Sequence, residues 1–310
     1  MIIRPRKAVL HVWDHESQVA VFSKAELDLE DKAVKGYVRS VCTKAMGSTE
    51  CHRGVFEAGS MMPSSISRYA NDLTDLATFS AEVAQFLFDE LSHAQGAKST
   101  DLLAVDFLDG DECRYLGFFL LEGRRAFVHD VSQAGDAVSC DIVRHYGVLP
   151  GATQKLGSWA LISLADFGVR FVDRVRSIAG EDVMLLPEAL LRCSSQVSSK
   201  EAVSTVTKVV EQVADEHGAN STLAVARAKS YLTEHVGAEE SFSKEALASE
   251  VFEDSEPCQR AFRIQTDAQH MPERVEVDPR AVALKSVRHM RIVTDTGIEV
   301  SFPAEYGKNP

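Results

Sequence analysis

The sequence of 310 residues lacks the motifs by which most enzymes and metalloproteins are identified. It contains no glycine-rich phosphate loop, no Gly-x-Ser-x-Gly nucleophile turn and no His-Glu-x-x-His zinc motif. Its six cysteines include no Cys-x-x-Cys pair, and they are too few for a disulfide scaffold. We therefore expect reduced, mostly buried thiols, no metal site and no cofactor.

Long apolar runs are also missing. The longest aliphatic and aromatic cluster, residues 116–121, is far shorter than the roughly 20 residues that cross a bilayer. The basic N-terminus is followed by His11, Asp14 and His15, where a signal peptide requires an apolar segment. Because 45% of the residues are hydrophobic, the chain has enough apolar side chains to form a buried core. We expect a soluble, cytoplasmic globular protein.

Positive charge is scarce, and the formal net charge is −13. Residues 181–310 hold most of the excess, with 14 basic against 22 acidic side chains. Proteins that wrap DNA neutralise many phosphates with lysine and arginine, so this composition argues against a histone-like protein. Any nucleic-acid surface must be a local basic patch on a protein whose other carboxylates repel phosphates, and its binding should depend strongly on salt.

The first half of the chain predicts mainly antiparallel strands with helices beside them. Apolar residues recur at helical spacing over 31–46 and 79–91. An N-terminal hairpin is expected at 8–13 and 19–22, a three-strand meander at 102–107, 114–121 and 125–131, and further strands at 158–164 and 168–174.

The second half predicts helices. Ser198 and Glu201 form a capping-box motif that precedes a valine stripe ending before Gly218, and Asn220 can cap the next helix, which should end near Gly237. The valine stripe could face a dimer partner, but a core face is the better interpretation. Shorter helices at 244–251 and 257–269 and a hairpin over 290–302, turning at 295–297, complete the chain.

Short turns between consecutive strands predict an α+β fold. We expect an N-terminal mixed, mainly antiparallel sheet with flanking helices in residues 1–180. A helical C-terminal region closed by a β-hairpin should follow in residues 181–310.

Arginines supply the candidate contacts to a phosphate backbone. Arg170, Arg174 and Arg176 should project from one face of a strand, because residues two apart share a face. The alternative is a solvated sheet face paired with nearby acids. The remaining candidates lie at the turn before residue 126 and beside the closing hairpin: Arg124, Arg125, Arg288 and Arg291.

A group of carboxylates is a weaker candidate for a functional site than the arginines. Asp106, Asp109 and Asp111 lie in an acidic turn that resembles a metal loop in composition only, and a solvated hairpin turn explains them better. A nuclease with a carboxylate site is thus a third hypothesis. Aromatic residues are not interleaved with basic ones, which argues against a single-strand stacking platform.

Several sequence blocks, in this order and spacing, resemble the bacterial nucleoid-associated protein family. The C-terminal block Arg288–Tyr306 is the most telling, and it carries Thr-Asp-Thr-Gly-Ile-Glu at 294–299 and Pro-Ala-Glu-Tyr at 303–306. Earlier blocks lie at residues 7–13, 22–28, 101–105, 115–121, 125–129, 148–150, 154–156, 171–174, 188–193 and 271–276.

This resemblance implies a nucleoid-located protein that binds double-stranded DNA, as a homodimer and without catalytic activity. Contacts would be largely to phosphates and independent of sequence. A further role that the resemblance implies is in phage defence, as a DNA-binding partner of another component. The alternative hypothesis is therefore a protein-interaction subunit of a phage-defence or regulatory assembly.

Overall fold

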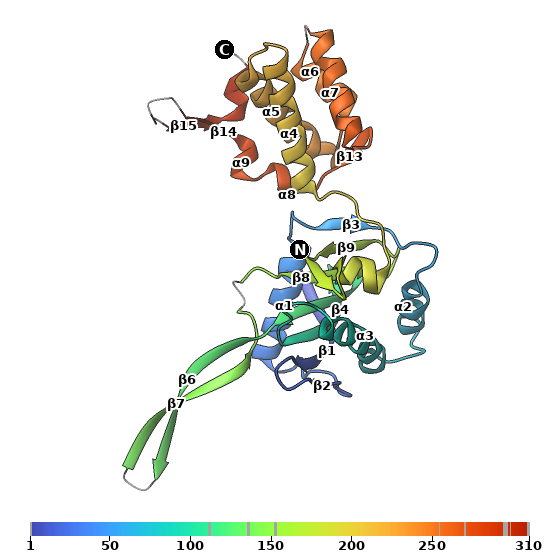
Figure 1. Cartoon of the computed structure of the whole chain (residues 1–310), viewed down its shortest axis with the longest axis vertical. Coiled ribbons are helices and arrows are strands. Elements are labelled where there is room, and N and C mark those ends of the chain that lie inside the picture. The colour runs from blue at the N-terminus through green and yellow to red at the C-terminus, as the bar shows by residue number, and fades with distance from the viewer. Residues whose placement is uncertain are drawn as a thin grey trace. The chain divides into compact units, whose positions relative to one another are not determined.

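The computed structural model describes residues 2–110, 113–134, 137–151, 154–253, 255–269, 271–293, 297 and 299–308. Its internal contacts divide the chain into unit 1, Met1–Gln196, and unit 2, Val197–Pro310 (Figure 1). A large antiparallel sheet with helices and a C-terminal hairpin confirm the expected α+β class.

Unit 1 is built on a seven-stranded antiparallel sheet with the strand order β2-β1-β4-β5-β8-β9-β3. The predicted N-terminal hairpin and the pairing of the 102–107 and 114–121 strands are confirmed. The strands are β1 (Ile3–Asp14), β2 (Val19–Val21), β3 (His52–Gly54), β4 (Thr100–Asp109), β5 (Cys113–Glu122), β8 (Ser158–Ser163) and β9 (Val169–Val172).

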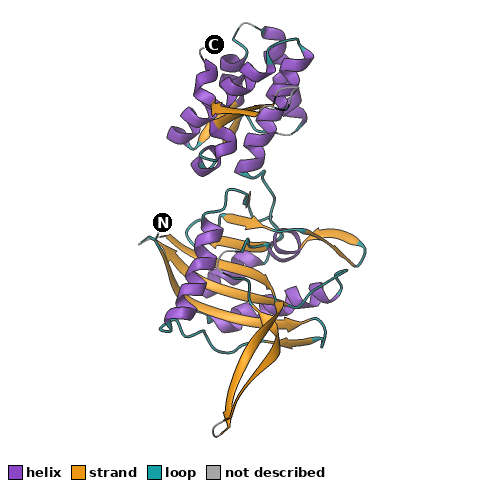
Figure 2. Ribbon diagram, turned by 90° about the vertical axis from the view of Figure 1, so that its left-hand side faces the viewer, coloured by secondary structure: helices purple, strands orange, loops and turns teal. Residues whose placement is uncertain are grey.

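Helices cover both faces of this sheet (Figure 2). Alternate residues of β4 enter different cores: Leu103 and Val105 pack with helix α1 (Lys32–Met46), whereas Leu102 and Ala104 pack with helix α3 (Leu76–Ser92). The short helix α2 (Met62–Ala70) joins the α3 side. Both predicted helices of this unit are confirmed, and their side-chain caps are Asp31 and Asp75.

The predicted third strand of the meander is wrong in its partner. Strand β6 (Arg124–Ala134) pairs with β7 (Ala137–Val148), and together they form a separate hairpin that projects from the sheet (Figure 1). Strand β8 takes the place beside β5. Its residues 158–162 are buried, whereas β6 would bring His129 and Asp130 into an apolar interior.

Unit 1 extends beyond residue 180. Strand β10 (Val175–Ile178) pairs with β11 (Glu181–Met184), and a π-helix follows at Leu185–Leu191. Leu185, Leu186 and Leu191 are fully buried in the core on the α3 side of the sheet. The contacts therefore place the division between the units after Gln196.

Unit 2 has a helical core. The capping box of Ser198 and Glu201 begins its first helix, and the valine stripe is buried in the core, as expected. The second helix passes Gly237 and ends at Glu239, and the C-cap residue Glu240 has a left-handed conformation with φ 54°. Its helices are α4 (Ser199–Glu216), α5 (Ser221–Glu239), α6 (Lys244–Val251), α7 (Glu256–Ala268), α8 (Pro279–Val282) and α9 (Lys285–Arg288).

Two short hairpins complete unit 2. The closing hairpin of β14 (His289–Val293) and β15 (Glu299–Pro303) is confirmed, and a 3-10 turn follows at Ala304–Lys308. Gly297 has a φ of 81°, as its turn position requires, while 294–296 lie outside the described residues. Strands β12 (Ser241–Ser243) and β13 (Arg274–Glu276) form a pair that the sequence pattern did not predict.

Candidate nucleic-acid interface

The arginines at 170, 174 and 176 do not share one face. Strand β9 ends at Val172, and the chain turns before β10, so these residues belong to different segments. Arg170 is half-buried, and its Nη2 lies 3.4 Å from the carbonyl oxygen of Met46. This guanidinium faces the end of α1 inside unit 1.

Arg176 serves the fold of unit 1. Its side chain is only 8% exposed, its Nη1 donates to Asp173 Oδ1 at 2.7 Å, and its Nη2 donates to Ser158 Oγ at 2.8 Å. Asp173 Oδ2 also accepts the amide of Leu186. This buried pair ties the turn after β9 to β8 and to the π-helix, so little of the guanidinium remains for a ligand.

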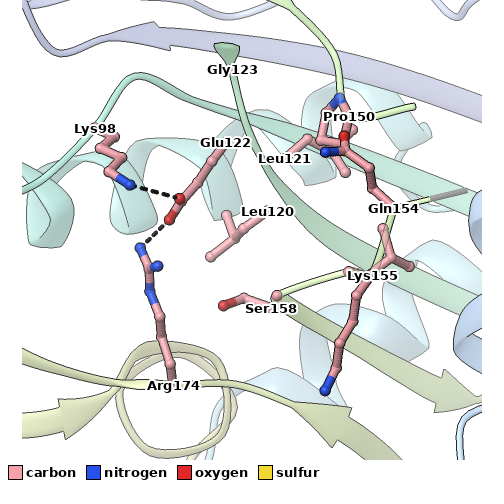
Figure 3. A pocket seen from close by; sticks show the side chains of 12 residues that line it. Lys98, Leu120, Leu121, Glu122, Gly123, Pro150, Gln154, Lys155, Ser158 and Arg174 are labelled. Atoms are coloured by element: carbon pink, nitrogen blue, oxygen red, sulfur yellow. Dashed lines mark hydrogen bonds and ion pairs between the residues drawn. The ribbon is translucent and has the colours of Figure 1, made fainter. Parts of the chain in front are cut away.

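Arg174 lies in a group of cations at one end of the sheet (Figure 3). Its guanidinium pairs with Glu122, and Lys98 Nζ lies 3.8 Å from the other oxygen of that carboxylate. Lys155 lines the same pocket of about 290 Å³ and pairs with Glu50. The side chains of Lys98, Lys155 and Arg174 are 65%, 75% and 50% exposed, so their charges remain accessible to solvent.

Arg124 and Arg125 follow Gly123, which lines this pocket. Their backbone belongs to β6, but their side chains lie outside the described part of the structure.

Helix α1 carries basic residues that the sequence patterns did not single out. Lys32, Lys35 and Arg39 follow a spacing of three and four, which places them along one side of the helix. Val38 and Val41 face the sheet instead. In the portion of the chain that the structure describes, none of the three cations pairs with a carboxylate.

A signal for this helix was present in the sequence. Residues 32–46 contain four basic side chains and no acidic one, in a chain whose net charge is −13. The fourth, Lys44, donates from Nζ to the carbonyl oxygen of Gln154, and Gln154 lines the pocket that holds Arg174. The helix and the pocket rim are therefore linked by a direct contact within unit 1.

In unit 2, the two predicted arginines differ. Arg291 Nη2 lies 2.6 Å from Glu299 Oε2 across the closing hairpin. Arg288 is exposed at the end of α9, close in sequence to the exposed Lys285. Neither Lys285 nor Arg288 has a carboxylate partner among the residues described.

The acidic residues near the β4–β5 turn are engaged within the fold. Asp106 is fully buried and accepts from Arg114 Nη2 at 2.7 Å and from the Tyr69 hydroxyl at 2.6 Å. Asp109 accepts the amide of Ile2, and Asp111 lies outside the described residues. Within the described ranges, no three His, Cys, Asp or Glu side chains are grouped as a metal site would require.

The composition of the helices and two comparisons with known proteins bear on what the chain is. Among the described helices, none is long and apolar enough to cross a membrane. A comparison with individually curated proteins finds no match. The model of the family described as nucleoid-associated protein YejK matches residues 9–308, which is nearly the whole chain. The chain therefore belongs to this nucleoid-associated protein family.

Proposed function

We propose that this protein binds double-stranded DNA in the nucleoid, mainly through phosphates and without sequence preference, as a non-catalytic homodimer. The observation that carries the proposal is the basic side of α1, formed by Lys32, Lys35 and Arg39. Membership of a nucleoid-associated family supports the choice of DNA as the partner.

The pocket rim extends this surface. Lys98 and Arg174 share the single carboxylate of Glu122, so the group retains one positive charge. A phosphate that approached Arg174 would compete with Glu122 for the guanidinium, which is suited to either anion. Arg124 and Arg125, which follow the rim residue Gly123 in the chain, are further candidates for this surface, and Arg288 is a separate candidate in unit 2.

The acidic remainder of the chain determines how such binding should behave. At about 0.1 M salt the Debye length is about 10 Å, so distant carboxylates are screened while cations in contact with phosphates are not. Each neutralised phosphate contributes about 0.9 to the slope of log affinity against log salt concentration. Three contacts from α1 correspond to a slope of about −2.7, and with three more from the rim the total slope becomes about −5.4.

A charge-matched pair of variants tests the proposal. One replaces Lys32, Lys35 and Arg39 with glutamine. The control replaces Arg68, Lys208 and Arg260, which are exposed and lie outside the proposed surface. Both remove three positive charges from a chain of net charge −13, so both have a net charge of −16.

Affinity for a mixed-sequence duplex is measured by fluorescence anisotropy over a series of salt concentrations. We expect the α1 variant to lose roughly tenfold in affinity at low salt and to have a slope smaller by about 2.7 units. The control should stay within about twofold of the wild type. Absence of wild-type binding at the lowest salt, or equal losses in both variants, contradicts the proposal.

The absence of catalysis is tested separately. Duplex and single-stranded DNA are incubated with the protein and Mg²⁺ or Mn²⁺, and we expect the substrates to remain intact. Cleavage that is lost in the Asp109→Asn variant would support a nuclease instead.

A further inference from the structure

Two neighbouring pockets lie at one end of the sheet of unit 1. The pocket of about 290 Å³ described above shares Lys98, Glu122 and Arg174 with a second pocket of about 360 Å³. Three strand ends frame them, because Thr100 at the start of β4 pairs with Glu122 at the end of β5, and β8 begins beside β5 at Ser158. Both volumes are close to the lower end of the range of small-molecule sites, about 300–1,000 Å³, and a DNA duplex is too wide to enter them.

The wall of the first pocket is partly apolar and is fixed by the fold. Leu120, Leu121 and Leu156 line this pocket and are buried in the two cores of unit 1. Ser158 also lines it, and its hydroxyl accepts a hydrogen bond from Arg176 Nη2 at 2.8 Å. A preformed apolar wall with a few fixed polar groups is typical of a small-molecule site. It suits a ligand with a flat, largely apolar body.

The boundary between the two pockets holds two cations and one carboxylate. Lys98 and Arg174 both point at Glu122 (Figure 3). The ion pair of Lys98 is loose, because its Nζ lies 3.8 Å from the carboxylate oxygen, and this is longer than a hydrogen bond. Within the described ranges, the ammonium group of Lys98 makes no hydrogen bond. The two cations therefore exceed the carboxylate by one positive charge, and Lys98 keeps its donors.

A phosphate monoester matches these cations better than the carboxylate of Glu122 does. Such a phosphate carries about −1.5 to −2 charges at pH 7 and three acceptor oxygens, whereas a carboxylate carries one charge. It can neutralise both Lys98 and Arg174, and it can accept two parallel hydrogen bonds from the guanidinium. The side chain of Glu122 is 30% exposed, so water can hydrate its carboxylate after displacement. A phosphodiester of DNA carries a single negative charge and lacks this advantage.

We propose that the two pockets bind a nucleoside monophosphate. Its phosphate lies between Lys98 and Arg174 in place of Glu122, and its base lies along the apolar wall formed by Leu120 and Leu156. The same two cations belong to the surface proposed for DNA, so a bound nucleotide should weaken DNA binding. This regulatory effect rests on the proposed function, whereas the nucleotide site itself does not.

The ligand class is tested by isothermal titration calorimetry on the full chain after nuclease treatment. The three titrants are adenosine monophosphate, adenosine and inorganic phosphate. We expect one adenosine monophosphate to bind per chain, with an affinity roughly tenfold or more above that of either fragment, because the wall and the cations both contribute. Absence of binding by adenosine monophosphate overturns the proposal. Equally tight binding of inorganic phosphate also overturns it, since the site would then recognise an anion only.

The location is tested first by a gain of affinity. Glu122→Gln removes the carboxylate that competes with the phosphate, and it should raise the affinity for adenosine monophosphate by about threefold or more. Misfolding does not produce such a gain. An unchanged or lower affinity would contradict the displacement of Glu122.

A matched pair of glycine variants tests the location by a loss of affinity. Gly157 lines the first pocket, and a Cβ at this position would meet no atom within 4 Å, so Gly157→Leu should narrow the pocket without a clash. Gly237→Leu is the control, because Gly237 lies in α5 of unit 2 and has the same open surroundings. We expect a roughly tenfold loss in Gly157→Leu and less than about twofold in Gly237→Leu. Equal affinities in these two variants would overturn the location.

Fluorescence anisotropy with a mixed-sequence duplex separates this inference from the proposed function. At constant ionic strength, saturating adenosine monophosphate should raise the apparent dissociation constant of the wild type for DNA by about threefold or more. It should have no effect on Gly157→Leu, which retains every cation of the surface. A wild type that binds the nucleotide but not DNA overturns the proposed function and leaves the nucleotide site standing. Independent binding of both ligands overturns the regulatory effect alone.

Discussion

His11 and Ser80 meet in the interior of unit 1, where His11 Nε2 lies 2.8 Å from Ser80 Oγ. His11 Nδ1 accepts the backbone N–H of Ser23, so the ring proton is on Nε2 and is donated to Ser80. Ser80 donates in turn to the carbonyl oxygen of Leu76. Both side chains are fully buried, and this arrangement suits a neutral imidazole with a structural role.

Protonation of His11 at acidic pH should lower the stability of unit 1. Burial lowers the pKa of His11 from 6.5 to about 4, so the unfolded state binds more protons between these values. The contribution of neutral His11 to the free energy of unfolding is complete above pH 6.5. It is lost as the pH falls towards 4, which lowers this free energy by about 3 kcal/mol. Burial raises the pKa of Asp101 from 3.8 to about 6, so Asp101 has the opposite effect as the pH falls over the same window.

We therefore expect wild-type unit 1 to have a shallow pH dependence and Asp101→Asn to lose stability more steeply below pH 6. Urea unfolding is followed by the fluorescence of Trp13 and Trp159, the chain's two tryptophans, both buried in unit 1. His11→Gln is the control and should remove the acid-sensitive component. Equal slopes in wild type and Asp101→Asn would contradict the assignment.

Arg114 should be essential to unit 1, because it compensates the buried charge of Asp106. Arg114→Met leaves that carboxylate without its bidentate partner, and the expected loss in the free energy of unfolding is about 3 kcal/mol. Arg6 lies 3.5 Å from the same carboxylate and its side chain is 42% exposed, so Arg6→Met should cost less than about 1 kcal/mol. Tryptophan fluorescence measures both, and similar losses would disprove the ranking.

Removal of two tyrosine hydroxyls should change the free energy of unfolding in different directions. Within the described structure, the Tyr37 hydroxyl is buried without a hydrogen-bond partner, so Tyr37→Phe should preserve stability or raise it by about 1 kcal/mol. The Tyr69 hydroxyl donates to Asp106 at 2.6 Å, so Tyr69→Phe should lower stability by about 2 kcal/mol. Urea denaturation compares the two, and destabilisation by Tyr37→Phe would show that its hydroxyl has a partner.

Arg174 and Arg176 should separate DNA binding from folding. Arg174→Gln is expected to weaken duplex binding two- to threefold and to reduce the salt slope by about 0.9, with little change in stability. Arg176→Gln breaks the buried pair with Asp173 and should lower the unfolding free energy by about 3 kcal/mol. Anisotropy and urea denaturation are measured on both variants. Equal effects on binding and stability would argue against this division of roles.

Elements with local signals were predictable from the sequence. The helix that begins after Ser198 follows from its capping box and valine spacing, and the helix that begins after Asp31 from apolar residues at helical spacing. The closing hairpin follows from alternation around Gly297. Such signals act over a few residues, so they hold before any tertiary contact is made.

Strand partners and the fate of single charges were not predictable in this way. Alternation identifies β6 as a strand but does not identify β7 as its partner, because many registers satisfy one strand's pattern. Likewise, the spacing of Arg170, Arg174 and Arg176 implies a shared face only if one strand continues through all three. The chain turns after Val172, and the three guanidinium groups have different environments.

By itself, the sequence determined the α+β class, most of the helices, the family resemblance and the basic character of residues 32–46. Only the tertiary structure decided that Asp106 and Arg176 are paired within the fold and that β6 pairs with β7 outside the seven-stranded sheet. The physical reason is the separation along the chain between the residues that interact. Capping and periodicity depend on neighbours along the chain, whereas burial and ion pairing depend on residues that are brought together only when the sheet is assembled.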